Sequence, residues 1–484
     1  MTSDTESAEL IESTYAKVFG IAQPTENAVR LVKILSILLP SFAASFQIST
    51  SFYMIFIAET LGGDYITGIA YVGVLVTVQL AIQTLLDYPT GAIGDWIGQR
   101  YVIASALLCY SAAFFLTAQV APDTPFTIFL VIYALFGLGS SQESGAFNAW
   151  FDNNYRVAMP HDVDRKQYGV FQGRLGMVWQ VSSTLVLIPG SYLAFITSRN
   201  WVFFLQSIFC IALAIIVMMV VKDLPGVRDE SEKRPSLSEY KNLLLDGVRF
   251  LTSTRFVTFL VLGEVVLFSV GPVWWNLNLF PFYYWFLLTE VAVSSFRTLV
   301  FIPQAIANER SGVWSRRFDA EKWIPRFRFL QFGGPVFYVI LALIVHTFPG
   351  AVEGVAVIPF IGFPVTTLIP VLLIFITFVG VSLFGGFAGI LTQRVMLDVI
   401  PNRIRNSMYS LEPTLVMLLS MPLLLFFGWL TSATGFTLPF AFCAEITLIG
   451  VLLIAIAFTY PVVKAEVHMA EEEEAEVVQE LEIT

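Results

Sequence analysis

Charged side chains inside otherwise apolar stretches are the residues of this sequence that could do chemistry. A charge in the hydrocarbon core of a membrane is costly, so it indicates an ion pair, a proton carrier or a ligand contact. Carboxylates at such positions could carry protons, and arginines could bind anionic groups of a solute. The residues concerned are Glu143, Arg174, Glu264, Arg297, Glu412 and Glu445.

Depth along the stretches predicts which of these charges could meet. Glu143 and Arg174 each lie about seven residues, or roughly 10 Å, from the same end of neighbouring stretches. Equal depth on adjacent helices predicts an ion pair, with either a structural or a functional role. Arg297 lies near the middle of its stretch, so we expect it to face water, Glu264 or an anionic substrate, and it is the preferred substrate-binding cation.

Glu264 is a candidate proton carrier, and the alternative for it is a buried ion pair with Arg297. Glu412 ranks below Glu264 because it lies only a few residues inside its stretch, where it could serve the helix dipole. Neutral polar residues that could contact a substrate are Gln47, Gln83, Trp275 and Asn278. Aromatic residues near helix ends are also common interface anchors.

Twelve long apolar stretches must position these residues. Hydrophobic residues make up 56% of the 484-residue chain and charged residues 13%, against roughly a quarter charged in soluble proteins, so a water-soluble fold is excluded. About twenty apolar residues cross a core of roughly 30 Å as a helix. The expected spans are Leu31 to Ile57, Ile66 to Tyr88, Tyr101 to Ala121, Phe126 to Trp150, Tyr168 to Phe195, Trp201 to Val221, Val257 to Asn278, Trp285 to Asn308, Phe327 to Phe348, Val365 to Ile390, Met408 to Thr431 and Phe436 to Tyr460.

The stretches predict an all-α, polytopic membrane protein with two pseudo-symmetric six-helix bundles. The expected parts are an N-terminal segment at 1–30, a first bundle at 31–221, a linker at 222–256, a second bundle at 257–460 and an acidic tail at 461–484. Residues 351–364 are expected to form an outer loop or a re-entrant hairpin. Residues 237–251 could lie on the membrane surface as an amphipathic helix.

Basic residues indicate the sidedness. They fall on alternate connections, whereas the opposite connections hold essentially only Arg199. Because basic loops stay in the cytoplasm, we expect a multi-pass protein of the plasma membrane with both termini cytoplasmic. The net charge of −10 comes largely from the two ends of the chain, and such an acidic tail is usually solvated.

Scattered cysteines and histidines predict neither a disulfide framework nor a metal site. Cys109, Cys210 and Cys443 lie in separate apolar stretches, and the three histidines are far apart in the sequence. We therefore expect no cofactor and no metal. The expected partners are the lipid bilayer and a small-molecule substrate, and no nucleic acid.

The connection between the second and third stretches carries a motif. It reads Asp87-Tyr-Pro-Thr-Gly91-Ala-Ile-Gly94-Asp95-Trp-Ile-Gly98-Gln-Arg100. In a short loop, its glycines would permit a tight turn, Asp95 could accept hydrogen bonds from a helix N-terminus, and Arg100 could pair with an acid. In its twelve-span frame, this motif resembles the conserved loop of the major facilitator superfamily, which lies between the same two helices.

The resemblance implies a central cavity between the halves, alternating access by rocking of the halves, and a cytoplasmic latch at the loop motif. We therefore expect a secondary transporter for a small organic solute, and Glu264 or Glu143 could couple its transport to protons. The alternative is a non-transporting receptor or scaffold on the same fold. A membrane-embedded enzyme is less favoured, because no catalytic cluster of His, Asp or Cys is seen.

Overall fold

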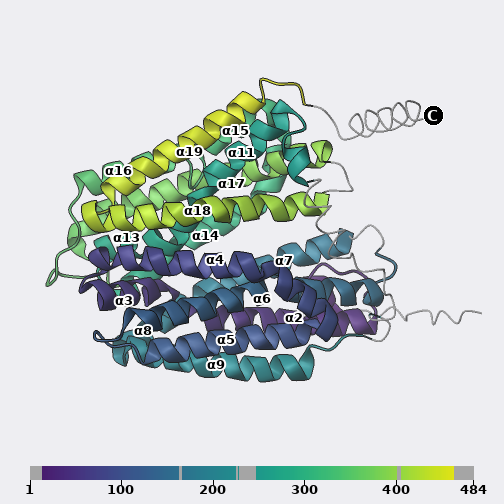
Figure 1. The fold of residues 1–484 in the computed structure, drawn as a ribbon, viewed down its shortest axis with the longest axis horizontal. Helices are drawn as coiled ribbons and strands as arrows, with labels where there is room; N and C mark the ends of the chain where they lie inside the picture. Colours follow the sequence, from purple (N-terminus) through teal and green to yellow (C-terminus); the bar gives the residue numbers. More distant parts are fainter. Residues whose placement is uncertain (1–12, 163–165, 225–226, 228–246, 401–404, 463–484) are drawn as a thin grey trace, which may run out of the picture. The chain divides into compact units, whose positions relative to one another are not determined.

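The computed structural model describes residues 13–162, 166–224, 227, 247–400 and 405–462 (Figure 1). These residues form helices joined by short connections. Within the described ranges, the one β-type pairing is an isolated bridge between Val357 and Pro364. The predicted all-α fold is therefore confirmed.

The helices that precede the linker follow the expected spans, and two of these spans are interrupted. A break at residues 48–49 divides the first span, and a break at residue 186 divides the fifth. The helices are α1 (Thr14–Val18), α2 (Glu26–Gln47), α3 (Thr50–Gly62), α4 (Tyr65–Ile97), α5 (Gln99–Ala118), α6 (Phe126–Ala158), α7 (Lys166–Leu185), α8 (Leu187–Ile196) and α9 (Arg199–Val220).

The helices that follow the linker include a π-helical segment, η1, inside the seventh expected span. They are α11 (Arg255–Ser269), α12 (Gly271–Val273), η1 (Trp274–Asn278), α13 (Leu279–Leu287), α14 (Glu290–Trp314), the 3₁₀ helix η2 (Ser315–Arg317), α15 (Ala320–Leu330), α16 (Pro335–Thr347), the 3₁₀ helix η3 (Val365–Thr367), α17 (Leu368–Val399), α18 (Arg405–Thr434) and α19 (Thr437–Ala457).

Eleven helical stretches of the described chain are long and apolar enough to cross a membrane. The expected eighth span corresponds to α14, which is not among these eleven. At 25 residues, this helix is about 37 Å long, which is sufficient to span the core. It differs in polarity, because Arg297, Gln304 and three serines lie within it.

Hydroxyl side chains start the helices that carry the later site residues. Ser198 accepts a hydrogen bond from the Trp201 amide at 3.2 Å and begins α9, so Arg199 falls in the first turn of that helix. Thr254 accepts from the Val257 amide at 3.2 Å and begins α11. Such caps satisfy amides that have no partner within the helix and thereby set where it begins.

The chain forms two compact units. Unit 1 comprises Met1–Tyr65, Leu75–Lys233 and Thr289–Thr298, and unit 2 comprises Ile66–Val74, Arg234–Leu288 and Leu299–Thr484. In unit 1, α5 packs against α6 and α9, and α2 packs against α7 (Figure 1). In unit 2, α11 and α16 pack against α19, and α15 packs against α17.

Aromatic rings dominate both cores. In unit 1, the ring of Tyr53 lies 5.7 Å from that of Phe136 and 5.6 Å from that of Phe203. In unit 2, the buried Trp274 of η1 lies within 6.1 Å of several rings, which are those of Phe282, Phe332, Phe337, Tyr338, Phe378 and Phe440. Edge-on and tilted ring contacts of this kind stabilise a core beyond the area that they bury.

Glycines let α11 and α19 approach closely. A Cβ atom on Gly450 would lie 2.7 Å from the Leu267 backbone nitrogen and 2.9 Å from the Gly263 carbonyl oxygen. Because both neighbours are backbone atoms of a packed helix, neither can move aside independently.

We expect Gly450→Ala to destabilise unit 2 by about 1–3 kcal/mol, because the added methyl group overpacks the contact. The melting temperature of the purified protein in detergent should fall by several degrees. Gly380→Ala in α17 is the matched control, because a Cβ atom there meets no heavy atom within 4 Å. Equal melting temperatures for the two variants would contradict the close contact.

The structure corrects one predicted loop and resolves another. Helix α4 continues through the motif as far as Ile97, so the expected loop between the second and third spans is reduced to Gly98. At φ 107°, Gly98 has a backbone conformation that favours glycine. Residues 351–364 form an irregular loop in which the Ile358 amide donates to the Phe363 carbonyl at 2.8 Å, and not a helical re-entrant hairpin. Most of the proposed surface helix at 237–251 lies outside the described residues.

Candidate functional site: a buried charge cluster in unit 2

A buried ion pair joins α11 and α15 in unit 2. The Arg328 guanidinium donates from Nε to Oε1 of Glu264 at 2.9 Å and from Nη2 to Oε2. The side chains of Arg328 and Glu264 are 5% and 3% exposed. A two-point arrangement of this kind is the strongest geometry for an arginine and a carboxylate.

Further groups complete the surroundings of the guanidinium. Nη1 of Arg328 donates to Oε1 of Gln331 at 3.0 Å, and Nη2 also donates to Oγ1 of Thr392 on α17 at 3.2 Å. The ring of Phe268 lies 4.8 Å from the guanidinium carbon. Every nitrogen of the guanidinium therefore has an acceptor, as a buried charge requires.

A second carboxylate lies within electrostatic reach of this pair. Glu412 of α18 is partly buried and interacts with the charges of both Glu264 and Arg328. The charge cluster, defined as Glu264, Arg328 and Glu412, thus combines two carboxylates with one guanidinium. With both carboxylates ionised its net charge is −1, and with one protonated it is neutral.

The ion pair with Arg297 that was the alternative for Glu264 is not formed, because Arg328 binds both oxygens of the Glu264 carboxylate. Depth explains the choice. Glu264 lies nine residues beyond the start of α11 and Arg328 eight residues beyond the start of α15, or about 12–14 Å along each helix at 1.5 Å per residue. Both spans enter from the side predicted to be cytoplasmic, whereas α14 enters from the other side.

Sequence reasoning missed Arg328 because it lies at the second position of an expected span, where an arginine is normally an interface residue. Two features of the sequence could have identified Arg328, which are its match in depth with Glu264 and the presence of a second arginine, Arg326, two residues earlier. Two residues apart, Arg326 and Arg328 lie about 200° apart around a helix, so only one of them can face lipid. Arg297 is partly buried and lies in the part of α14 that belongs to unit 1.

The predicted ion pair between Glu143 and Arg174 is not formed. Arg174 is exposed and donates from Nη1 to the backbone oxygens of Lys17, at 3.0 Å, and of Val18. These carbonyls belong to the end of α1, where backbone acceptors have no partner within the helix. Glu143 is partly buried on α6 and interacts with Tyr110.

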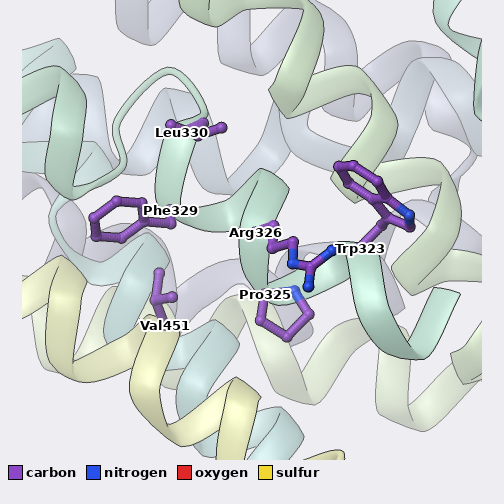
Figure 2. Close-up of a pocket in the computed structure, with 6 residues that line it drawn as sticks. All are labelled: Trp323, Pro325, Arg326, Phe329, Leu330 and Val451. Atoms are coloured by element: carbon purple, nitrogen blue, oxygen red, sulfur yellow. The ribbon is translucent and has the colours of Figure 1, made fainter. Parts of the chain in front are cut away.

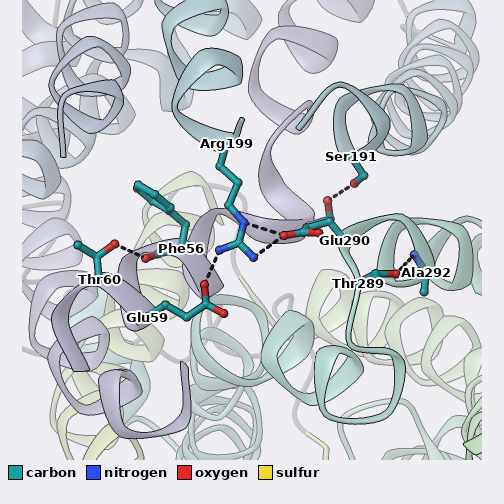
Figure 3. Close-up of polar contacts among 9 residues, drawn as sticks. Phe56, Glu59, Thr60, Ser191, Arg199, Thr289, Glu290 and Ala292 are labelled. Atoms are coloured by element: carbon teal, nitrogen blue, oxygen red, sulfur yellow. Dashed lines mark hydrogen bonds and ion pairs between the residues drawn. The ribbon is translucent and has the colours of Figure 1, made fainter. Parts of the chain in front are cut away.

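A second charge cluster lies in unit 1, where Arg199 contacts two carboxylates (Figure 3). Arg199 donates from Nε to Oε1 of Glu290 at 2.7 Å, and its Nη1 contacts Oε2 of Glu59. The three side chains are 15–32% exposed. This Arg199 cluster joins the end of α3 to the starts of α9 and α14, so it links segments from before and after the linker.

The sequence identified Arg199 as the exceptional basic residue on its side, but not its acidic partners. Glu59 lies just beyond the first expected span and Glu290 lies in the first turns of the eighth, and charges are ordinary near span ends. Pairing one arginine with two carboxylates explains why a lone basic residue is present among those connections.

The neutral candidates have different surroundings. Gln47 ends α2 and Gln83 lies on α4, and both are partly buried. Trp275 is 47% exposed, and its ring lies 5.8 Å from that of Phe332. Asn278 is fully buried, and neither polar atom of its amide has a hydrogen-bond partner in the described structure. Both Trp275 and Asn278 lie in η1, and π-helical turns are frequent at functional sites.

The loop motif has contacts other than those expected for Arg100. Its Nη2 donates to the Tyr101 hydroxyl at 2.7 Å, and the guanidinium carbon lies 4.6 Å from the Tyr101 ring centre. A Cβ atom on Gly94 would approach Gln99 Oε1 to 2.6 Å, so glycine permits that contact. Asp87 is exposed, and the side-chain contacts of Asp95 lie outside what the structure describes.

Comparison with known families decides the class. The family model of the Major Facilitator Superfamily matches residues 38–373. The chain belongs to the major facilitator superfamily. No match was found among curated proteins. The predicted membership is confirmed, and the protein is a multi-pass membrane transporter rather than an enzyme.

Solved structures of superfamily members share the fold at low identity. The nucleoside transporter NupG is 13% identical with a TM-score of 0.65, over 90% of this chain and 100% of that one. The inward-open xylose transporter XylE from E. coli is 12% identical with a TM-score of 0.56, over 88% and 95%. An auto-inhibited peptide transporter of the POT family is 11% identical with a TM-score of 0.62, over 90% and 98%.

Proposed function

We propose that this superfamily member is a secondary active transporter that moves a small organic solute by alternating access, with the charge cluster as its proton-coupling centre. The observation that carries the proposal is a buried ion pair with a second carboxylate in reach, inside membrane-spanning helices. Such groups are costly in a membrane and usually mark ion pathways.

Glu412 is the proposed proton carrier. Arg328 binds both oxygens of Glu264, so that carboxylate is poorly placed to exchange a proton. Glu412 is less buried than Glu264, and its carboxylate is not held by a two-point contact with an arginine. Its protonation would make the charge cluster neutral, and its deprotonation would restore a net charge of −1. Glu143 is the second candidate, because it is partly buried in α6.

The Arg199 cluster is proposed to close the outer side. Its ion pairs join α3 and α9 to α14, which follows the linker in the sequence. Alternating access requires contacts between segments of the two halves that form in one state and break in the other. The distribution of basic residues supports cytoplasmic termini and therefore an outer position for this end.

The proposed substrate contacts remain those expected from the sequence, which are Arg297, Gln47, Gln83, Trp275 and Asn278. Arg297 would bind an anionic or strongly polar group of the solute. The buried amide of Asn278, with both polar atoms unpartnered, would gain hydrogen bonds from a bound solute. The solute classes in the names of the structural neighbours, a nucleoside, xylose and peptides, define a first panel.

Transport can be tested with uridine, xylose and dialanine. The purified protein is first screened for an increase in melting temperature, and the stabilising solute is then used for counterflow in proteoliposomes. We expect exchange of labelled for unlabelled solute. Stabilisation without exchange would contradict transport and support the alternative of a receptor on the same fold.

We expect Glu412→Gln to abolish proton flux while preserving solute counterflow. Glutamine mimics a permanently protonated carboxyl group, so the exchange half-cycle survives while the coupled ion cannot be released. A pH-sensitive dye inside the liposomes reports proton flux, and Glu445→Gln is the control, because Glu445 is an exposed carboxylate on α19. Undiminished solute-driven acidification in Glu412→Gln would exclude Glu412 as the coupling group.

A further inference from the structure

A groove of about 390 Å³ lies between α15 and α19 on unit 2 (Figure 2). Its walls are mainly apolar, and Val451 of α19 faces the α15 side chains across it. The charge cluster does not contribute to it. The lining residues are Trp323, Pro325, Arg326, Phe329, Leu330 and Val451.

Arg326 supplies the one cationic group of this lining. Its side chain is exposed, and its guanidinium carbon lies 5.2 Å from the centre of the Trp323 ring. Among the described residues, no carboxylate lies within ion-pair distance of it, in contrast to Arg328 two residues later. The stacked ring orients the guanidinium, while its charge stays open to an external anion.

The groove lies near one end of both helices, where we expect the boundary between lipid headgroups and acyl chains. Arg326 lies six residues beyond the start of α15, and Val451 lies six residues before the end of α19, so both are about 9 Å from the same end of their helices. Next to the groove, α19 exposes Leu448 and Leu452, as a lipid-facing helix does. A long arginine side chain at this depth can reach the headgroup level.

We propose that this groove binds an anionic glycerophospholipid of the cytoplasmic leaflet. The phosphate would accept hydrogen bonds from Arg326, and an acyl chain would lie along Phe329, Leu330 and Val451. Basic grooves between spanning helices at the cytoplasmic side suit such headgroups. The apolar walls beside the cation favour a lipid over a free phosphate, because a phosphate has no apolar surface to bury against them.

Native mass spectrometry can test the site on the full chain in an equimolar mixture of phosphatidylglycerol and phosphatidylcholine. We expect wild-type protein to retain phosphatidylglycerol preferentially and Arg326→Gln to lower that preference about fivefold, the effect of one interfacial cation. Lys322→Gln is the matched control, because Lys322 lies one turn earlier on α15, outside the groove, and is 73% exposed. Melting temperatures of both variants check that folding is intact.

A second measurement separates a lipid from a free anion. Phosphatidylglycerol with brominated acyl chains should quench the Trp323 fraction of the fluorescence, which is obtained as the difference from Trp323→Phe. Soluble glycerol phosphate should not relieve the quenching. Retention of the preference in Arg326→Gln, an equal loss in Lys322→Gln, or full displacement by glycerol phosphate would each overturn the proposal.

Discussion

Arg328→Leu should lower the stability of unit 2 by about 3–5 kcal/mol, because it leaves the Glu264 carboxylate buried without a counter-charge. Glu264 is 3% exposed, so water cannot replace the lost donors. The leucine side chain also removes the hydrogen bonds to Gln331 and Thr392. Thermal unfolding in detergent measures the loss, which we expect to be the largest of any single substitution proposed for this protein.

The double variant Glu264→Leu with Arg328→Leu provides the control. When both charges are removed, no unpaired group remains, and replacement of a buried pair by apolar residues is often neutral or stabilising. The double variant should therefore recover most of the melting temperature while it fails to couple solute flux to protons. If the double variant is as unstable as the single one, the loss comes from packing and not from the unpaired carboxylate.

Arg199→Gln should favour opening of the end proposed to be the outer side about 10²- to 10⁴-fold. Arg199 bonds two carboxylates that lie on α3 and α14, and each bond to a charged group contributes about 1.5–3 kcal/mol. The low exposure of these side chains limits screening by solvent. Loss of the guanidinium also leaves Glu59 and Glu290 facing each other as like charges, which further favours separation.

Hydrogen–deuterium exchange in the absence of substrate measures this opening. Uptake should rise in peptides that cover 54–63 and 286–296 and stay unchanged in unit 2 around the charge cluster. Arg156→Gln is the control, because the Arg156 pair with Asp152 on the same helix is 49% and 22% exposed and should contribute under 1 kcal/mol. Equal exchange in Arg199→Gln and wild type would rule out a closing role for the cluster.

The helices were largely predictable because hydropathy reports on the solvent, and lipid leaves a spanning backbone no alternative to a helix. Hydropathy could not predict local departures from regular helices, such as where a helix ends or changes its turn. The continuation of α4 through the motif runs against the low helix propensity of Pro89, Gly91 and Gly94, and the helix ends only at Gly98, which has a positive φ. The π-helical turn at Trp274–Asn278 leaves no periodic signal in a stretch that is apolar on every side.

The candidate site was predicted in part. Glu264 was identified because a carboxylate inside a span is conspicuous, but its partner was not, because pairing depends on depth and on helix rotation together. Arg297 has the charge needed to pair with Glu264 but lies at a different depth, whereas Arg328 has both the charge and the depth. The same reasoning explains Arg174, which matched Glu143 in depth but lies on a face that contacts the end of α1.

The π-helical turn has a consequence for comparing this chain with its relatives. Its closing bond runs from the Leu279 amide to the Trp274 carbonyl, five residues back, so the turn holds one residue more than an α-helical turn. An aligned relative without the turn would need a one-residue gap inside a membrane helix, where gaps are normally forbidden. Deleting Leu277 would turn α13 back by about 100° relative to α11, so register in this span is a variable that a single-codon indel can change.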